Sequence, residues 1–164
     1  MKKIFLFIAI AFSVATNAQV TKVSLQASGL TCSMCSNSIN KALKTLDFVD
    51  KVDADIKKYT FEIIFKSNSA VDFDMIKKKV EGAGFAVSGF VATMLFNNVQ
   101  VINNQPITIE DKTFYFVNTS DQLVNGAKEI QVLDKGFVSS KEYKRNSFPN
   151  PSLRTYHVSL YHQK

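Results

Sequence analysis

Both cysteines of this chain, Cys32 and Cys35, lie in the stretch GLTCSMC at residues 29–35. Two thiolates at this spacing can converge on one ion without straining the backbone. Two soft sulfur ligands, with no other obvious ligand nearby, suit a soft ion of low coordination number, above all Cu(I). A structural zinc site would take four ligands. The leading interpretation is therefore a metal site formed by Cys32 and Cys35.

Two other uses of the cysteine pair stay open from the residues alone. A thioredoxin-like redox pair usually carries Trp before the motif and Gly-Pro inside it, whereas this chain has no Trp and has Ser33 and Met34 in the gap. An inert disulfide is the third alternative, and it would close too short a loop to stabilise the fold much through chain entropy.

Three further residues invite a ligand role. The thioether of Met34 suits Cu(I), but neighbouring side chains on a helix point apart, so we expect it to pack or face solvent. His157 and His162 have zinc-finger spacing. On one strand, however, an odd offset puts their rings on opposite faces. We expect no joint chelation, although either ring alone could approach a metal ion.

The elements that must position the cysteines follow from the hydrophobic periodicity of residues 20–90. The pattern predicts strand, helix, strand, strand, helix and strand, the order of the ferredoxin-like fold. The segments are a strand at 20–27, a helix from about 34 to 46, a hairpin of 52–56 and 59–65 turned by Lys57-Lys58, a helix capped by Asp72 and ended by Gly82 and Gly84, and a strand at 85–90. Cys35 then falls at the start of the first helix, where the helix dipole favours a thiolate.

The remaining sequence predicts a different unit. Its segments are strands at 95–102, 113–117, 129–133 and 156–161, with a short helix at 139–145. This order is that of an OB-like barrel. We therefore expect an α+β protein, with a ferredoxin-like βαββαβ domain at 19–92 followed by a small β-rich, OB-like domain of unknown role at 93–164.

The first residues predict export. Lys2 and Lys3, an apolar run from Ile4 to Val14 and small residues up to Ala18 form the three parts of a signal peptide at residues 1–18. The apolar run is short for a bilayer, which needs about 20 residues, so a retained anchor is the weaker alternative. We expect a periplasmic or secreted protein without a membrane span after signal removal.

The stretch Gly29-Leu30-Thr31-Cys32-Ser33-Met34-Cys35, in this order of elements, resembles the heavy-metal-associated domain of copper chaperones and P-type ATPases. That family's motif is Gly-Met-Thr-Cys-x-x-Cys, so Leu30 replaces the usual Met. Gly84-Phe85 matches the family's Gly-Tyr or Gly-Phe, which implies that Phe85 shields the metal loop. The resemblance implies binding of Cu(I), or of other soft or thiophilic ions, by Cys32 and Cys35. It also implies hand-over to a partner metal-binding domain or metal transporter.

No set of residues suggests an enzymatic reaction, so we expect a metal-binding protein and not an enzyme. The net charge of +6 does not identify a partner, and export makes nucleic acid the least expected one. The lysines of both predicted helices could dock an acidic partner or form an ordinary solvated face. The rival functions are a thiol-disulfide oxidoreductase and an interaction module whose metal loop is vestigial.

Overall fold

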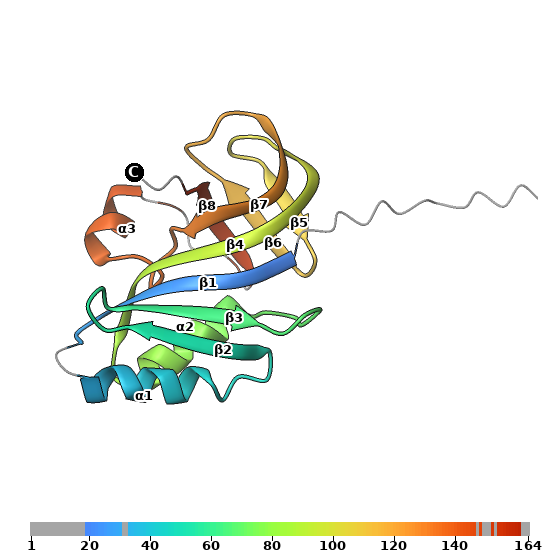
Figure 1. Cartoon of the computed structure of the whole chain (residues 1–164). Coiled ribbons are helices and arrows are strands. Elements are labelled where there is room, and N and C mark those ends of the chain that lie inside the picture. Colours follow the sequence, from blue (N-terminus) through green and yellow to red (C-terminus); the bar gives the residue numbers. More distant parts are fainter. Residues whose placement is uncertain (1–18, 31–32, 147, 149–151, 153, 162–164) are drawn as a thin grey trace, which may run out of the picture.

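The computed structural model describes residues 19–30, 33–146, 148, 152 and 154–161. The signal-peptide prediction for residues 1–18 and the positions of Cys32 and His162 lie outside these residues. Along these described residues the elements follow one another as β1 (Gln19–Ser28), α1 (Ser33–Leu43), β2 (Val49–Asp55), β3 (Thr60–Phe65), α2 (Phe73–Gly82), β4 (Ala86–Val101), β5 (Pro106–Ile109), β6 (Lys112–Phe116), β7 (Gln122–Val132), α3 (Ser140–Asn146) and β8 (Thr155–Leu160) (Figure 1).

The first six elements form the predicted ferredoxin-like arrangement. Strand β1 pairs with β3 on one side and β4 on the other, and β3 pairs with β2, all antiparallel. Helices α1 and α2 pack together against one face of these strands (Figure 1). The apolar stripes predicted for the helices are buried, as Ile39, Leu43, Ile76 and Val80 show. The fold therefore brings the end of β1, the start of α1 and the end of α2 to one end of the sheet.

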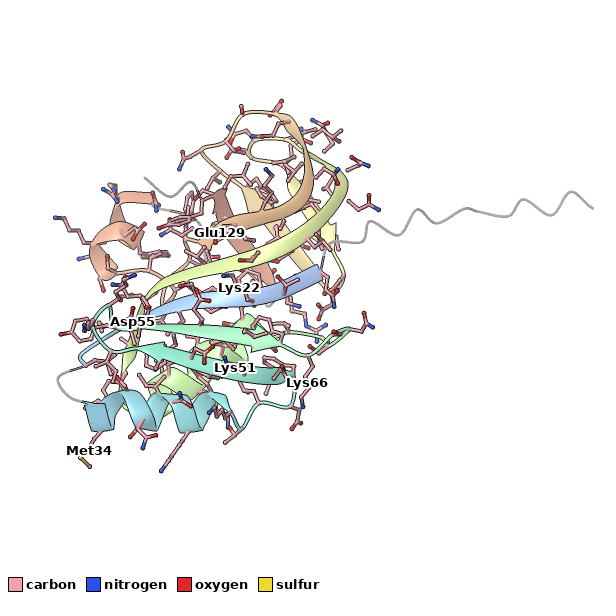
Figure 2. The ribbon with its side chains drawn as sticks, viewed as in Figure 1. Lys22, Met34, Lys51, Asp55, Lys66 and Glu129 are labelled. Carbon is pink, nitrogen blue, oxygen red and sulfur yellow. The ribbon has the colours of Figure 1, made fainter. Side chains whose placement is uncertain are left out.

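The opposite face of the sheet is polar and exposed. Lys22 and Lys51 project from it (Figure 2), where the ammonium of Lys22 lies 3.5 Å from Glu62 and that of Lys51 lies 2.7 Å from Asp53. Alternation of buried and exposed side chains along these strands produces this two-sided pattern. Such exposed ion pairs contribute little to stability.

Strand β4 is the main departure from the predicted elements. The sequence predicts separate strands at 85–90 and 95–102, but the chain stays extended throughout Ala86–Val101. No Gly-Pro or Asn-Gly signal breaks the chain between them, and buried side chains recur through Ala92 and Met94 to Phe96. The extra length of β4 gives the later strands an edge to join.

The OB-like barrel predicted for residues 93–164 is not confirmed. Its strands continue the first sheet, which has the order β2-β3-β1-β4-β7-β8-β6-β5. The link is the antiparallel pairing of β4 with β7, and β6 and β8 run parallel. The division of the chain at residue 92 stays a prediction; in the structure that residue lies within β4.

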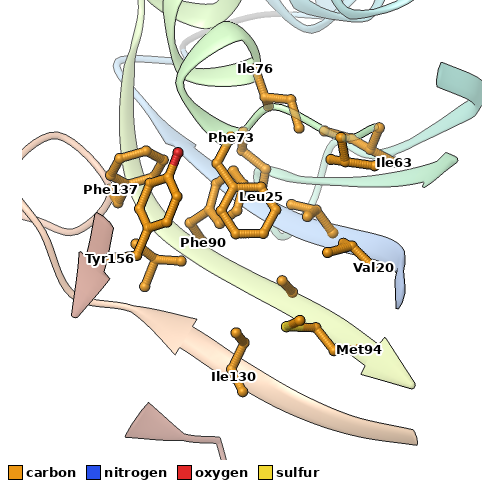
Figure 3. Packing of buried hydrophobic residues seen from close by; sticks show 14 of the residues in the cluster. Val20, Leu25, Ile63, Phe73, Ile76, Phe90, Met94, Ile130, Phe137 and Tyr156 are labelled. Atoms are coloured by element: carbon orange, nitrogen blue, oxygen red, sulfur yellow. The ribbon is translucent and has the colours of Figure 1, made fainter. Parts of the chain in front are cut away.

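An aromatic core joins the two parts of the chain (Figure 3). The ring of Phe73, on α2, lies 5.0 Å from that of Phe90 and 5.2 Å from that of Tyr156 on β8. Phe137 packs edge-on against Phe90 at 5.1 Å and against Tyr156 at 5.8 Å. Burial of each such ring contributes about 1.5–3 kcal/mol, so this cluster holds the later strands against α2.

Candidate metal centre

The loop that carries the cysteine pair begins with a chain reversal at Gly29. This residue has φ +85, in the left-handed region that glycine adopts without steric cost. Leu30 follows and is buried in the core, as expected for the residue that replaces the family's Met. The loop is therefore anchored directly before the cysteines.

Cys35 is the third residue of α1, at the helix start predicted from the sequence. Its side chain is half-buried and packs against the core cluster. The first turn of α1 contains no acidic residue, so the positive end of the helix dipole is not offset there and favours a thiolate. Cys32 lies outside the described residues, so the distance between the two sulfurs belongs to the proposal below.

Phe85 reaches the loop because of the way α2 ends. The amide of Phe85 donates to the carbonyl of Val80 at 3.2 Å, and the amide of Gly84 donates to that of Glu81 at 2.9 Å. These two bonds, with Gly84 at φ +90, form a Schellman motif. A Cβ placed on Gly29 would lie 3.9 Å from the ring of Phe85. The ring of Phe85 thus lies beside the start of the loop, and its shielding of the cysteine pair stays a prediction.

Met34 points away from the protein at the tip of α1 (Figure 2) and is 79% exposed. This position agrees with the expected solvent-side role. Lys41 and Lys44 are exposed as well. Lys77 differs from them, because its ammonium lies 2.7 Å from Asp74 and 4.5 Å from the centre of the Phe137 ring. The exposure of Lys41 and Lys44 is compatible with both a solvated face and a docking face, while Lys77 stabilises the contact between α2 and the later part of the chain.

The side chain of His157 is buried in the core of the later strands. Its Nδ1 lies 2.8 Å from Oδ1 of Asp134, and its backbone amide donates to Oδ2 of Asp134 at 2.7 Å. The imidazole stacks on Phe148 at 4.6 Å and on Tyr115 at 5.5 Å. Burial raises the pKa of Asp134, while the hydrogen bonds from His157 act in the opposite direction. These contacts are those of a structural residue.

Within the described ranges, no three His, Cys, Asp or Glu side chains gather in a way that could hold a metal ion. The same residues contain no helix with the length and apolar character needed to cross a membrane. The cysteine pair stays the predicted ligand set of the loop. The polar contacts of Asp74 and Asp134 could not be predicted from the sequence, because no local motif indicates them.

Residues 24–86 match the Heavy-metal-associated domain family model. The mercuric transport protein periplasmic component of Shigella flexneri is 33% identical over 89 residues, which are 54% of this chain and 97% of that protein. The chain belongs to the heavy-metal-associated domain family. The probable copper-transporting ATPase HMA5 of Arabidopsis thaliana is 35% identical to it over 69 residues, 42% of this chain but only 7% of the plant protein.

Among solved structures, the copper transporter domain Ccc2a of yeast is 33% identical, with 41% of this chain and 90% of that domain covered and a TM-score of 0.37. The family match covers residues 24–86, which include Cys35, Gly84 and Phe85. The strands from β5 to β8 lie beyond these residues.

Proposed function

We propose that this protein is an exported carrier of a soft heavy-metal ion, above all Cu(I), held by the thiolates of Cys32 and Cys35 for transfer or sequestration. The observation that carries the proposal is the setting of Cys35 within a heavy-metal-associated domain. Its side chain lies in the first turn of α1 and packs against the hydrophobic core, as Phe85 also does. The metal ion is the cargo of the protein.

The exposed side chain of Met34 supports hand-over to another protein. Met34, next to Cys35 in the sequence, is 79% exposed, so a partner loop can approach the cargo. A partner metal-binding domain or a metal transporter would accept the ion by exchange of sulfur ligands. The predicted signal peptide and the periplasmic relative both favour a periplasmic or secreted location.

Hg(II) is the second candidate cargo, and the mercuric transport relative is the observation that favours it. The mercuric ion is also thiophilic, so the same two thiolates would hold it. Export exposes the cysteine pair to oxidation, whichever ion it carries, because disulfides persist in oxidising compartments. The pair can bind a metal ion or form a disulfide, and the two states exclude each other.

Competition for Cu(I) between the reduced protein and a Cu(I)-specific chelator tests the proposal. The protein should start at residue 19, with variants Cys32→Ser, Cys35→Ser and the double substitution. We expect one Cu(I) per wild-type chain and none at this site in the double variant, which stays folded because neither thiol belongs to the apolar stripes. Met34→Leu is the matched control and should retain the ion. A parallel titration with Hg(II) ranks the two cargoes.

Catalysis of disulfide exchange is the outcome that would replace this proposal. A wild-type protein that fails to retain Cu(I) or Hg(II), yet reduces a test protein disulfide, is a thiol-disulfide oxidoreductase. A protein that shows neither activity fits an interaction module with a vestigial loop. We assign no enzymatic reaction to the protein.

A further inference from the structure

A cavity of about 520 Å³ lies between the heavy-metal-associated domain and the later part of the chain. Ser28 at the end of β1 and Ala86 at the start of β4 form one wall. The segment 135–144, which leads from β7 into α3, forms the other wall. Small-molecule sites have volumes of about 300–1,000 Å³ and favour boundaries between structural units, and this cavity meets both conditions.

The floor of the cavity is apolar. Val87 and Val138 line it and are almost fully buried. Tyr143 adds an aromatic ring, and it packs against the small core cluster that contains Val138. A ligand that fills this space must therefore carry an apolar body.

The rim of the cavity is cationic. Lys135 and Lys144 both line it and are exposed. Ser139 and Ser140 add hydroxyl groups; the Ser139 oxygen accepts from the amide of Glu142 at 3.2 Å, which leaves its O–H able to donate. Among the described residues that line the cavity, none is acidic. The charge of the rim therefore favours an anionic group.

We propose that this cavity binds a small organic acid, with its apolar body on Val87, Val138 and Tyr143 and its carboxylate beside Lys135. An inorganic anion would leave the apolar floor unfilled, and an organic cation would meet the lysines with like charge. A carboxylate that accepts hydrogen bonds from an ammonium group gains more than a neutral partner would. The apolar floor together with the cationic rim therefore favours an organic acid as the ligand.

The site adjoins the metal loop without sharing the cysteines. The hydroxyl of Ser28 donates to the carbonyl of Ala86 at 3.3 Å, so this pair closes the cavity wall. Gly29 follows Ser28 and Phe85 precedes Ala86, and a Cβ placed on Gly29 would lie 3.9 Å from the ring of Phe85 at the start of the loop. The inference goes beyond metal carriage, and either proposal can fail alone.

Isothermal titration of the mature protein with decanoate tests the assignment, and decylammonium serves as the matched cationic probe. We expect saturable binding of one decanoate per chain and binding of decylammonium that is weaker by about tenfold or more, a difference of about 1.4 kcal/mol. Lys135→Glu should weaken decanoate binding by a similar factor. Lys141→Glu, the same charge change on an exposed residue of α3 outside the cavity lining, should leave it unchanged.

Ser140→Trp provides a second variant that does not depend on charge. Ser140 is exposed and lines the cavity, so an indole should occupy part of the space and weaken decanoate binding while the urea midpoint stays near that of the wild type. The proposal is overturned if decanoate does not saturate a site, if decylammonium binds as tightly, or if Lys135→Glu and Lys141→Glu have equal effects.

Discussion

Gly29 and Gly84 set the two chain reversals that bring Phe85 to the metal loop. Both residues have positive φ, +85 and +90 respectively. Gly82, at the end of α2, has no such constraint, and nothing lies within 4 Å of the position its Cβ would occupy. The three glycines therefore differ in what a methyl group would cost.

Gly29→Ala should lower the free energy of unfolding by about 1–2 kcal/mol, because an L-residue is strained at this φ. Gly82→Ala should leave it unchanged or raise it by up to about 1 kcal/mol, because alanine has the higher helix propensity. Urea unfolding of both variants measures the difference. Equal effects of the two substitutions would show that the reversal at Gly29 does not constrain the loop.

The elements that surround the candidate metal centre could be predicted because their signals are local. Asp72 caps α2 by accepting from the amide of Met75 at 3.0 Å, and Cys35 lies at the start of α1, both as the sequence indicates. The hydrogen bond from the His157 amide to Asp134 joins residues 23 positions apart. The identity of either residue does not indicate such a distant partner. Contacts of this kind depend on the strand pairing, which the local pattern does not contain.

At the scale of elements, the docking of α2 against β8 organises the centre of the molecule. The Tyr156 hydroxyl donates to Oδ2 of Asp74 at 2.9 Å, and Lys77 contacts the other oxygen of the same carboxylate. Burial is the largest cause that raises the pKa of Tyr156 well above its usual range, and the negative charge of Asp74 raises it further. Tyr156 therefore stays protonated in the folded protein at alkaline pH.

Tyr156→Phe should lower the free energy of unfolding by about 1 kcal/mol at neutral pH through loss of one hydrogen bond. The wild type should also lose stability as pH rises above about 10, where the tyrosine of the unfolded chain ionises and the folded one does not. One such group contributes a limiting slope of about 1.4 kcal/mol per pH unit.

Tyr156→Phe should lack this component of the slope, as urea unfolding between neutral and alkaline pH will show. Tyr161→Phe is the control, because Tyr161 is 38% exposed. If the two substitutions give the same pH dependence, Tyr156 does not couple α2 to β8 in this way.

The predicted elements of the later part are largely present, but their assembly was not predictable from their patterns. Periodicity identifies strands such as β6 and β8, and it also indicates the short helix α3. It does not state which edges pair, and the same alternation serves a closed barrel or an extended sheet. The unbroken length of β4 favours an extended sheet over a closed barrel. The sequence indicates this length, because no turn or breaker residue separates the two strands predicted there.

At the scale of the whole molecule, one eight-stranded sheet and one aromatic core connect the metal-binding and later parts. Strand β7 pairs along β4, which would otherwise be an open sheet edge. Open edges of this kind pair with other chains. The later strands thus protect the edge of the heavy-metal-associated domain as well as its core.

A fragment of residues 19–92 should be less stable than the full mature chain and prone to self-association. Phe73 and Phe90 would lose their contacts with Tyr156 and Phe137, which we expect to lower the free energy of unfolding by at least about 3 kcal/mol. Urea unfolding and sedimentation velocity at several concentrations measure both effects. A monomeric fragment with the urea midpoint of the full chain would contradict this dependence.

Copper K-edge absorption spectroscopy of the protein loaded with one Cu(I) tests most directly whether Cys32 and Cys35 together hold the cargo ion. We expect a first coordination shell of two sulfur atoms at low coordination number. Met34→Leu should leave the spectrum unchanged, because Met34 points into solvent. A first shell of nitrogen or oxygen, or a sulfur shell that persists after Cys32→Ser and Cys35→Ser are combined, would show that the two cysteines are not the ligands.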